Sequence, residues 1–139
     1  MGSNMSVEMQ RRTTVLVVDE EQAVLDELAE VLAEAGFLCR CCSTTADALH
    51  QARQGELDLI ISNIHLQGHS GMELCDRIRQ TRSGKPIPLM FLSGAQIPDI
   101  ILRRGSAGGS YYLRKPFDSG VLVELVRKAV APPHQLATH

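Results

Sequence analysis

Two kinds of apolar pattern alternate along the chain. Short runs that are apolar at nearly every position predict strands buried on both faces, and longer stretches with apolar residues every three or four positions predict amphipathic helices. The short runs predict five strands, at residues 15–18, 37–42, 57–62, 88–92 and 111–113. The periodic stretches predict five helices, at residues 24–35, 45–53, 71–79, 98–104 and 119–129.

The regular alternation of strands and helices predicts an α/β fold. We expect a five-stranded parallel sheet, doubly wound, with helices on both faces and the flavodoxin-like strand order 2-1-3-4-5. Turn and capping residues support the proposed boundaries: Gly36 and Gly55 follow the first two helices, Pro98 opens the fourth, and Asp118 can cap the fifth.

Length and composition indicate one globular domain. The chain has 139 residues, of which 44% are hydrophobic and 22% charged. We expect the domain at residues 13–131, after a tag-like, disordered segment at 1–12 and before a tail or linker start at 132–139. No apolar stretch is long enough for a membrane span or typical of a signal peptide, which favours a cytoplasmic location. The net charge of −2, with Lys and Arg scattered, argues against direct binding of nucleic acid.

Three of the four cysteines, Cys39, Cys41 and Cys42, fall in the second predicted strand. Alternation along a strand directs them to both faces, and the CxxC spacing of zinc sites is missing. We therefore expect the cysteines to be small core residues and not a redox or metal site.

Polar residues close the predicted strands, at the rim where open α/β sheets bind ligands. Asp19 and Glu20 supply carboxylates that suit Mg²⁺, Lys115 supplies a charge that can pair with a phosphoryl oxygen, and Ser93 supplies a hydroxyl. Asn63 ends the third strand, and its amide has no carboxylate oxygen with which to attack phosphorus. The rim is suited to a phosphoryl group but lacks an acceptor.

Four separated segments give this rim a specific resemblance. They are Val15–Glu21 (VLVVDEE), Asp58–Gly71 (DLIISNIHLQGHSG), Phe91–Gly94 (FLSG) and Tyr112–Phe117 (YLRKPF). In their order and spacing they resemble the receiver domain of response regulators, the CheY-like family, over about residues 13–130. The resemblance implies a two-component (phosphorelay) signal-transduction module that is not an enzyme.

The resemblance also implies a role for each matched residue. Asn63 stands at the phosphorylated aspartate of the family, and Asp19, Glu20 and the backbone carbonyl of His65 stand at the acidic pocket that holds Mg²⁺. The switch and phosphate-pairing positions are matched by Ser93, Tyr112, Lys115 and Pro116. Receivers commonly contact partners through their fourth helix, fifth strand and fifth helix, here about residues 98–129, which nominates Ile101, Arg103, Arg104 and Tyr111.

The departures from the family pattern change the expected function. Asn63 argues against phosphorylation, and its neutral amide should leave Mg²⁺ binding weak and no cofactor required. Glu20 keeps the charge of the commoner aspartate. Gln67 replaces a usual proline, and Ser70 replaces a common aspartate. We expect these three changes to be tolerated.

Plainer roles compete with the functional ones. Asp19 and Glu20 could form the cap and first turn of the first helix, and Ser93 could cap the loop that follows it. Lys115 should contact Asp19 or Asn63. His65 and His69 are expected to be solvated and not metal ligands. The apolar side chains of Ile97, Ile100, Ile101 and Leu102 could be core residues or part of a partner surface. Tyr111 and Tyr112 should lie on opposite faces of their strand, one directed inward and one outward.

Three functional hypotheses follow. The first is a degenerate receiver that works by phosphorylation-independent contact with a histidine kinase or an output domain, or as a homodimer through the helix 4, strand 5 and helix 5 face. The second is an ordinary receiver in which Asn63 is an engineered replacement of the acceptor aspartate. The third, a haloacid-dehalogenase-like phosphatase, is remote because Glu21 stands where a second aspartate is needed.

Overall fold

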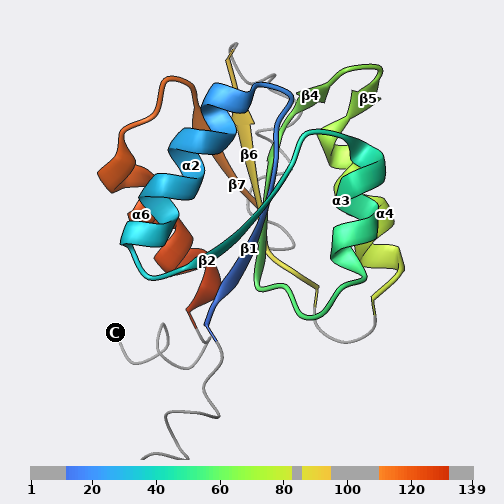
Figure 1. The fold of residues 1–139 in the computed structure, drawn as a ribbon, viewed down its shortest axis with the longest axis horizontal. Helices are drawn as coiled ribbons and strands as arrows, with labels where there is room; N and C mark the ends of the chain where they lie inside the picture. Colours follow the sequence, from blue (N-terminus) through green and yellow to red (C-terminus); the bar gives the residue numbers. More distant parts are fainter. Residues whose placement is uncertain (1–11, 83–85, 95–109, 132–139) are drawn as a thin grey trace, which may run out of the picture.

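In a computed structural model, the protein forms a parallel sheet between two layers of helices (Figure 1). The structure describes residues 12–82, 86–94 and 110–131. Its five-stranded sheet has the order β2-β1-β3-β6-β7, and all neighbouring strands are parallel. The strands are β1 (Thr14–Val18), β2 (Leu38–Cys42), β3 (Leu59–Asn63), β6 (Leu89–Ser93) and β7 (Ser110–Arg114). This order confirms the predicted doubly wound α/β fold.

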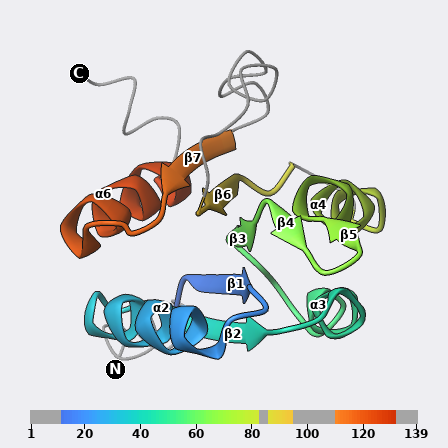
Figure 2. The same cartoon turned by 90° about the horizontal axis from the view of Figure 1, so that it is seen from above.

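The described helices cover the two faces of the sheet in pairs. Figure 2 shows helices α2 (Gln22–Glu34) and α6 (Ser119–Val130) on one face, and α3 (Thr45–Ala52) and α4 (Gly71–Gln80) on the other. Each pair encloses its own core cluster. Val15, Leu28 and Leu122 belong to the cluster under α2 and α6, whereas Leu16, Ala48 and Ile78 belong to the cluster under α3 and α4.

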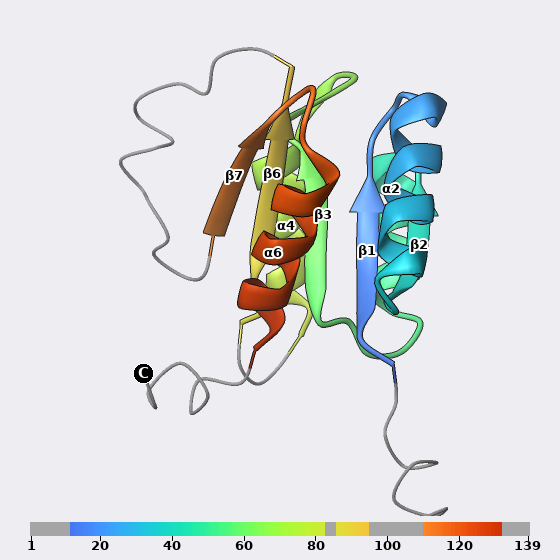
Figure 3. The same ribbon diagram turned by 90° about the vertical axis from the view of Figure 1, so that its left-hand side faces the viewer.

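The strand pattern explains this two-sided core. Every residue of β1 is buried, as are the first four of β3 and all of β6, because these strands lie inside the sheet with helices on both sides. The side view of Figure 3 shows α6 and α2 along one face, with β1, β3, β6 and β7 running side by side. The carboxyl ends of these parallel strands therefore share one edge, where the predicted site residues lie.

The sequence missed one small element. A two-stranded antiparallel hairpin, β4 (His65–Leu66) and β5 (His69–Ser70), follows β3 directly and pairs His65 with Ser70. Gly68 in its turn has a φ of +71°, a conformation that glycine adopts without the steric cost of a Cβ. The expected helix at 98–104 and the isoleucines of 97–101 lie outside the described residues.

Two predictions about edge strands need correction. Cys42 and Cys75 are buried as expected, but Cys41 is exposed and Cys39 half-buried, because β2 is an edge strand of the sheet. Core packing was therefore the wrong prediction for Cys41. Tyr111 and Tyr112 do lie on opposite faces of β7, but neither points away from the core: each is half-buried against a different core cluster.

Candidate functional site

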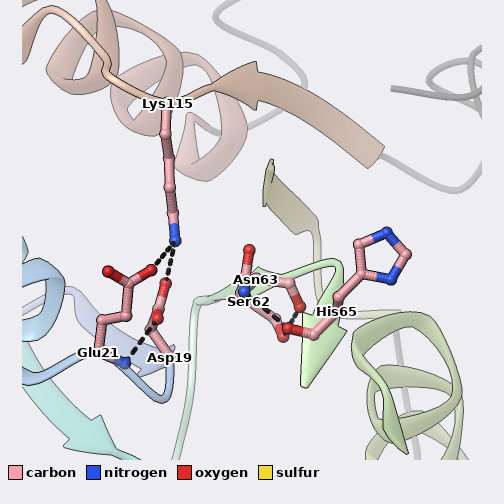
Figure 4. A network of polar contacts seen from close by, with 6 residues as sticks. All are labelled: Asp19, Glu21, Ser62, Asn63, His65 and Lys115. Atoms are coloured by element: carbon pink, nitrogen blue, oxygen red, sulfur yellow. Dashed lines mark hydrogen bonds and ion pairs between the residues drawn. The ribbon is translucent and has the colours of Figure 1, made fainter. Parts of the chain in front are cut away.

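Asp19, at the end of β1, is fully buried and has both carboxylate oxygens engaged (Figure 4). Its Oδ1 accepts a hydrogen bond from the backbone N–H of Glu21 at 2.9 Å, and its Oδ2 lies 2.7 Å from Lys115 Nζ. The carboxylate therefore does not cap α2. The N-cap residue of that helix is Glu21, whose side chain makes no capping bond, so the helix-cap alternative for Asp19 and Glu20 is wrong.

Lys115 reaches this carboxylate from the segment after β7. Its backbone N–H donates to the carbonyl of Ser93 at 2.7 Å, which fixes the start of the side chain beside β6. Its side chain is only 13% exposed, and Nζ also lies 3.7 Å from Glu21 Oε1. The predicted contact between Lys115 and Asp19 is thus confirmed, and the lysine ammonium lies between the carboxylates of Asp19 and Glu21.

Asn63, at the end of β3, turns its amide toward the following hairpin. Asn63 Nδ2 donates to the backbone carbonyl of His65 at 2.6 Å, and Ser62 Oγ donates to the backbone carbonyl of Asn63 at 2.9 Å (Figure 4). An aspartate could not make the first bond, because a carboxylate only accepts hydrogen bonds. The amide therefore holds the carbonyl that the receiver resemblance assigns to the metal site.

Helix α4 begins against this segment. The N–H of Gly71 donates to the carbonyl of Ile64 at 2.7 Å. A Cβ at Gly71 would overlap the carbonyl oxygen of Asn63 and lie 2.7 Å from Ser62 Oγ, so only glycine allows the helix to come this close. Ser70 caps α4, because its Oγ accepts from Met72 N at 3.1 Å and from Glu73 N at 3.4 Å. Sequence reasoning missed both roles, although the Ser-x-x-Glu spacing of residues 70–73 is typical of a helix N-terminus.

Glu20 faces a different space from Asp19. Its side chain is exposed and lines an open cavity of about 370 Å³ between the loop after β1, the loop after β2 and the hairpin. The other lining residues are Ser43, Thr44, Thr45, Leu66, Gln67 and His69. The two neighbouring carboxylates are therefore divided between a buried ion pair and a solvated pocket.

The remaining site residues surround the carboxyl ends of β6 and β7. Ser93 is buried, and Tyr112 stacks on Phe91 with ring centroids 5.7 Å apart. Pro116 is exposed and follows a cis peptide bond from Lys115. His65 and His69 are exposed, as expected. Of the nominated partner surface, Tyr111 packs against the core under α2 and α6, and Ile101, Arg103 and Arg104 lie outside the described residues.

Two of the oxygens expected to bind Mg²⁺ are already engaged within the chain. The metal would need free oxygens, yet Asp19 Oδ2 faces the Lys115 ammonium and the His65 carbonyl faces the Asn63 amide. In the described ranges 12–82, 86–94 and 110–131, no group of three or more His, Cys, Asp or Glu side chains is placed to hold a metal ion. The Lys115 ammonium and the Asn63 amide contact oxygens that the receiver resemblance assigns to the metal site.

The site and the fold together define a class of protein. The profile of the response regulator receiver domain matches residues 15–127, and the chain belongs to this family. Its fold is shared with CheY4 of Vibrio cholerae, a chemotaxis protein 23% identical, with a TM-score of 0.77 and coverage of 86% of this chain and 99% of that one. The signal receiver domain of an HD domain-containing protein from Pseudomonas fluorescens Pf-5 is 29% identical, with a TM-score of 0.75 and coverage of 91% and 99%. The protein is thus a two-component receiver domain of the CheY-like type.

Its curated relatives are longer proteins. The chain is 32% identical over 123 residues to the DNA-binding transcriptional regulator NtrC of Bradyrhizobium, covering 88% of this chain and 25% of that protein. It is 34% identical over 113 residues to the transcriptional activator protein IrlR of Burkholderia pseudomallei, covering 81% and 48%. The chain therefore spans half or less of the length of these two relatives. Within the described part of the chain, no helix is long and apolar enough to cross a membrane.

Proposed function

We propose that this receiver signals by protein contact without phosphorylation at position 63. The observation that carries the proposal is the hydrogen bond from Asn63 Nδ2 to the His65 carbonyl, at 2.6 Å. Asn63 stands at the family's acceptor position, and this bond uses its amide N–H as the donor. An acceptor aspartate has no such donor. No nucleophilic oxygen remains at this position, so a phosphoryl group has nothing to be transferred to.

The neighbouring charges support the same proposal. Lys115 pairs with Asp19, and its Nζ is also within 3.7 Å of Glu21, so the buried carboxylate is neutralised from within the chain. A divalent cation would have to displace this ammonium and the Asn63 amide before gaining its ligands. We infer that Mg²⁺ binds weakly, that no cofactor is required, and that the domain is not an enzyme.

Receiver domains work with histidine kinases and output domains, and the relatives named above are transcriptional regulators. We infer that residues 13–131 form the receiver, that its partner is a histidine kinase or an output domain, and that the contact uses the face of residues 98–129, which includes β7 and most of α6. Binding of DNA by this chain itself is not part of the proposal, because its net charge is −2. A cytoplasmic location and homodimerisation through the same face stay predictions.

One observation favours a second candidate. Asp19, Ser93 and Lys115, which match the family's metal, switch and phosphate-pairing positions, all lie at the carboxyl ends of strands of the parallel sheet. An ordinary receiver with an engineered replacement of its acceptor aspartate by Asn63 would have these same residues at the same positions. The coding sequence of the natural protein at this codon separates the two candidates.

The direct test is phosphorylation by a small phosphodonor. The protein and its Asn63→Asp variant are incubated with acetyl phosphate and Mg²⁺, and their intact masses are measured at intervals. We expect no phosphoryl gain in the protein as it stands and one labile phosphoryl group in Asn63→Asp. Asn63→Ala serves as the control for transfer to other side chains.

A phosphoryl mass on the unchanged protein, abolished by Asn63→Ala, would contradict the proposal. If neither the protein nor Asn63→Asp gains a phosphoryl group, more of the site than the acceptor has been lost, and the engineered-receiver candidate is excluded.

A further inference from the structure

Two thiols meet on the exposed edge of the sheet, away from the rim just described. Cys39 and Cys41 are two residues apart on β2, so their side chains share the face that α2 covers. Their Sγ atoms lie 3.7 Å apart. Cys42 points to the opposite face and is buried there, and Cys75 is buried in α4. The pair is therefore a dithiol distinct from the other two cysteines.

A disulfide does not suit this pair. Residues two apart on one strand are separated by about 6.6 Å along the strand, and their Cβ atoms point in parallel, whereas a disulfide brings the Cβ atoms to about 3.8 Å. Strand β2 is held in register with β1 through Thr14↔Leu38 to Val18↔Cys42, so it cannot fold to close that gap without losing pairing.

The spacing of the sulfurs does suit a bridging metal ion. Thiolate sulfurs bind Zn²⁺ at about 2.3 Å in tetrahedral geometry, which places two of them roughly 3.75 Å apart. The Cys39–Cys41 distance is 3.7 Å. The CxxC spacing is typical of closed zinc sites with four protein ligands. Its absence therefore argues against a closed site but not against an open site with two protein ligands.

A negative charge near the pair favours a bound cation. Asp26 of α2 lies near enough to act on Cys41, and its negative charge favours a bound cation. The guanidinium of Arg40 is directed elsewhere, since it donates to the carbonyl of Gln54 at 2.6 Å.

We propose that Cys39 and Cys41 form an open binding site for a zinc-type divalent cation, in which both sulfurs are ligands and water or a partner protein completes the coordination. Binding releases the thiol protons and leaves two thiolate–metal bonds, with no change in oxidation state. The site is independent of the signalling function proposed above. It places a metal ion beside the exposed Cys41 of the edge strand β2, where a second protein could contribute further ligands.

The test uses Co²⁺, which takes the same tetrahedral thiolate geometry as Zn²⁺ and absorbs light. The full chain, reduced and without an added affinity tag, is titrated with Co²⁺, and the sulfur-to-cobalt charge-transfer band is recorded. We expect one equivalent to bind and to be displaced by Zn²⁺. Cys39→Ser and Cys41→Ser should each weaken binding by roughly tenfold or more. Cys42→Ser and Cys75→Ser are the matched controls and should retain the band.

A second measurement needs no variant. Zn²⁺ should slow the alkylation of Cys41 in the unchanged protein, as followed by peptide mass. Absence of the band together with unchanged alkylation in Zn²⁺ would overturn the proposal. So would a band that survives in both Cys39→Ser and Cys41→Ser, or ready closure of a Cys39–Cys41 disulfide under mild oxidation.

Discussion

Lys115 Nζ lies 2.7 Å from Asp19 Oδ2, and the two residues are 96 positions apart in the sequence. Asp19 is fully buried, and the Lys115 side chain is nearly so. Such a pair is costly to break, because removing one partner leaves the other charge buried without compensation. The contact joins the first strand of the sheet to the segment after the last, and so it fixes the geometry of the rim.

Replacing Lys115 by Met should destabilise the protein by about 3 kcal/mol, because Asp19 loses its counter-charge in the interior. Urea denaturation followed by circular dichroism measures this loss. The matched control is Lys128→Met, in the exposed last turn of α6, which should change the free energy of unfolding by less than about 0.5 kcal/mol. The double variant Asp19→Asn/Lys115→Met should be more stable than Lys115→Met alone. Equal effects of Lys115→Met and Lys128→Met would show that the ion pair does not contribute.

Gly71→Ala should destabilise the protein by about 3 kcal/mol, because its Cβ would overlap the carbonyl oxygen of Asn63 and force α4 away from β3. Gly94→Ala is the matched control, since a Cβ there meets no atom within 4 Å. Thermal unfolding of the two variants side by side distinguishes steric overlap from a general cost of replacing glycine. Similar melting temperatures for the two would contradict the close approach.

Ser70→Ala should cost about 1 kcal/mol of stability, because two N–H groups in the first turn of α4 lose their acceptor. Ser70→Asp should retain the cap, since its carboxylate accepts the same bonds and is favoured at a helix N-terminus. Chemical denaturation measures both. A stability loss in Ser70→Asp as large as that in Ser70→Ala would show that the hydroxyl has another role.

Thiol reactivity should separate the four cysteines by pH. Cys41 is exposed, and its hydrogen bond with Cys39 lowers its pKa to about 7, so its alkylation by iodoacetamide should rise with pH through neutrality and level off above about pH 8. Burial raises the pKa of Cys75 to about 12, so that thiol should stay protonated and unreactive over the same range. Peptide mass after timed labelling gives both rates. Equal rates for Cys41 and Cys75 at pH 7 would refute the assignment.

The sequence predicted the fold well because apolar runs and helical periodicity directly reflect burial. Strand β1, for example, is apolar in sequence from Val15 to Val18 and fully buried in the structure. The position of Asp19, Asn63, Ser93 and Lys115 at one edge of the sheet was predictable because residues that end or follow parallel strands meet there. The pairing of Lys115 with Asp19 follows from charge once that edge is known.

Other features could not be predicted from local pattern. The exposure of Cys41 depends on β2 being an edge strand and on what covers it, neither of which is written in the alternation of residues. The Asn63 bond to the His65 carbonyl depends on the hairpin β4–β5, whose strands are only two residues long and carry no clear period. The division of Asp19 and Glu20 between an ion pair and an open cavity likewise arises from tertiary contacts.

At the rim, the Lys115 ammonium and the Asn63 amide engage oxygens that a receiver would offer to Mg²⁺. The most direct measurement is the change in melting temperature with Mg²⁺ for the protein and for Asn63→Asp. A carboxylate at position 63 adds a metal attraction of about 4 kcal/mol at an effective dielectric of about 20, before desolvation offsets much of it, and it adds repulsion to Asp19 when no metal is bound. We predict that Asn63→Asp is the less stable protein without Mg²⁺ and is stabilised by it, whereas the unchanged protein is not. A Mg²⁺-dependent rise in the melting temperature of the unchanged protein equal to that of Asn63→Asp would contradict the account.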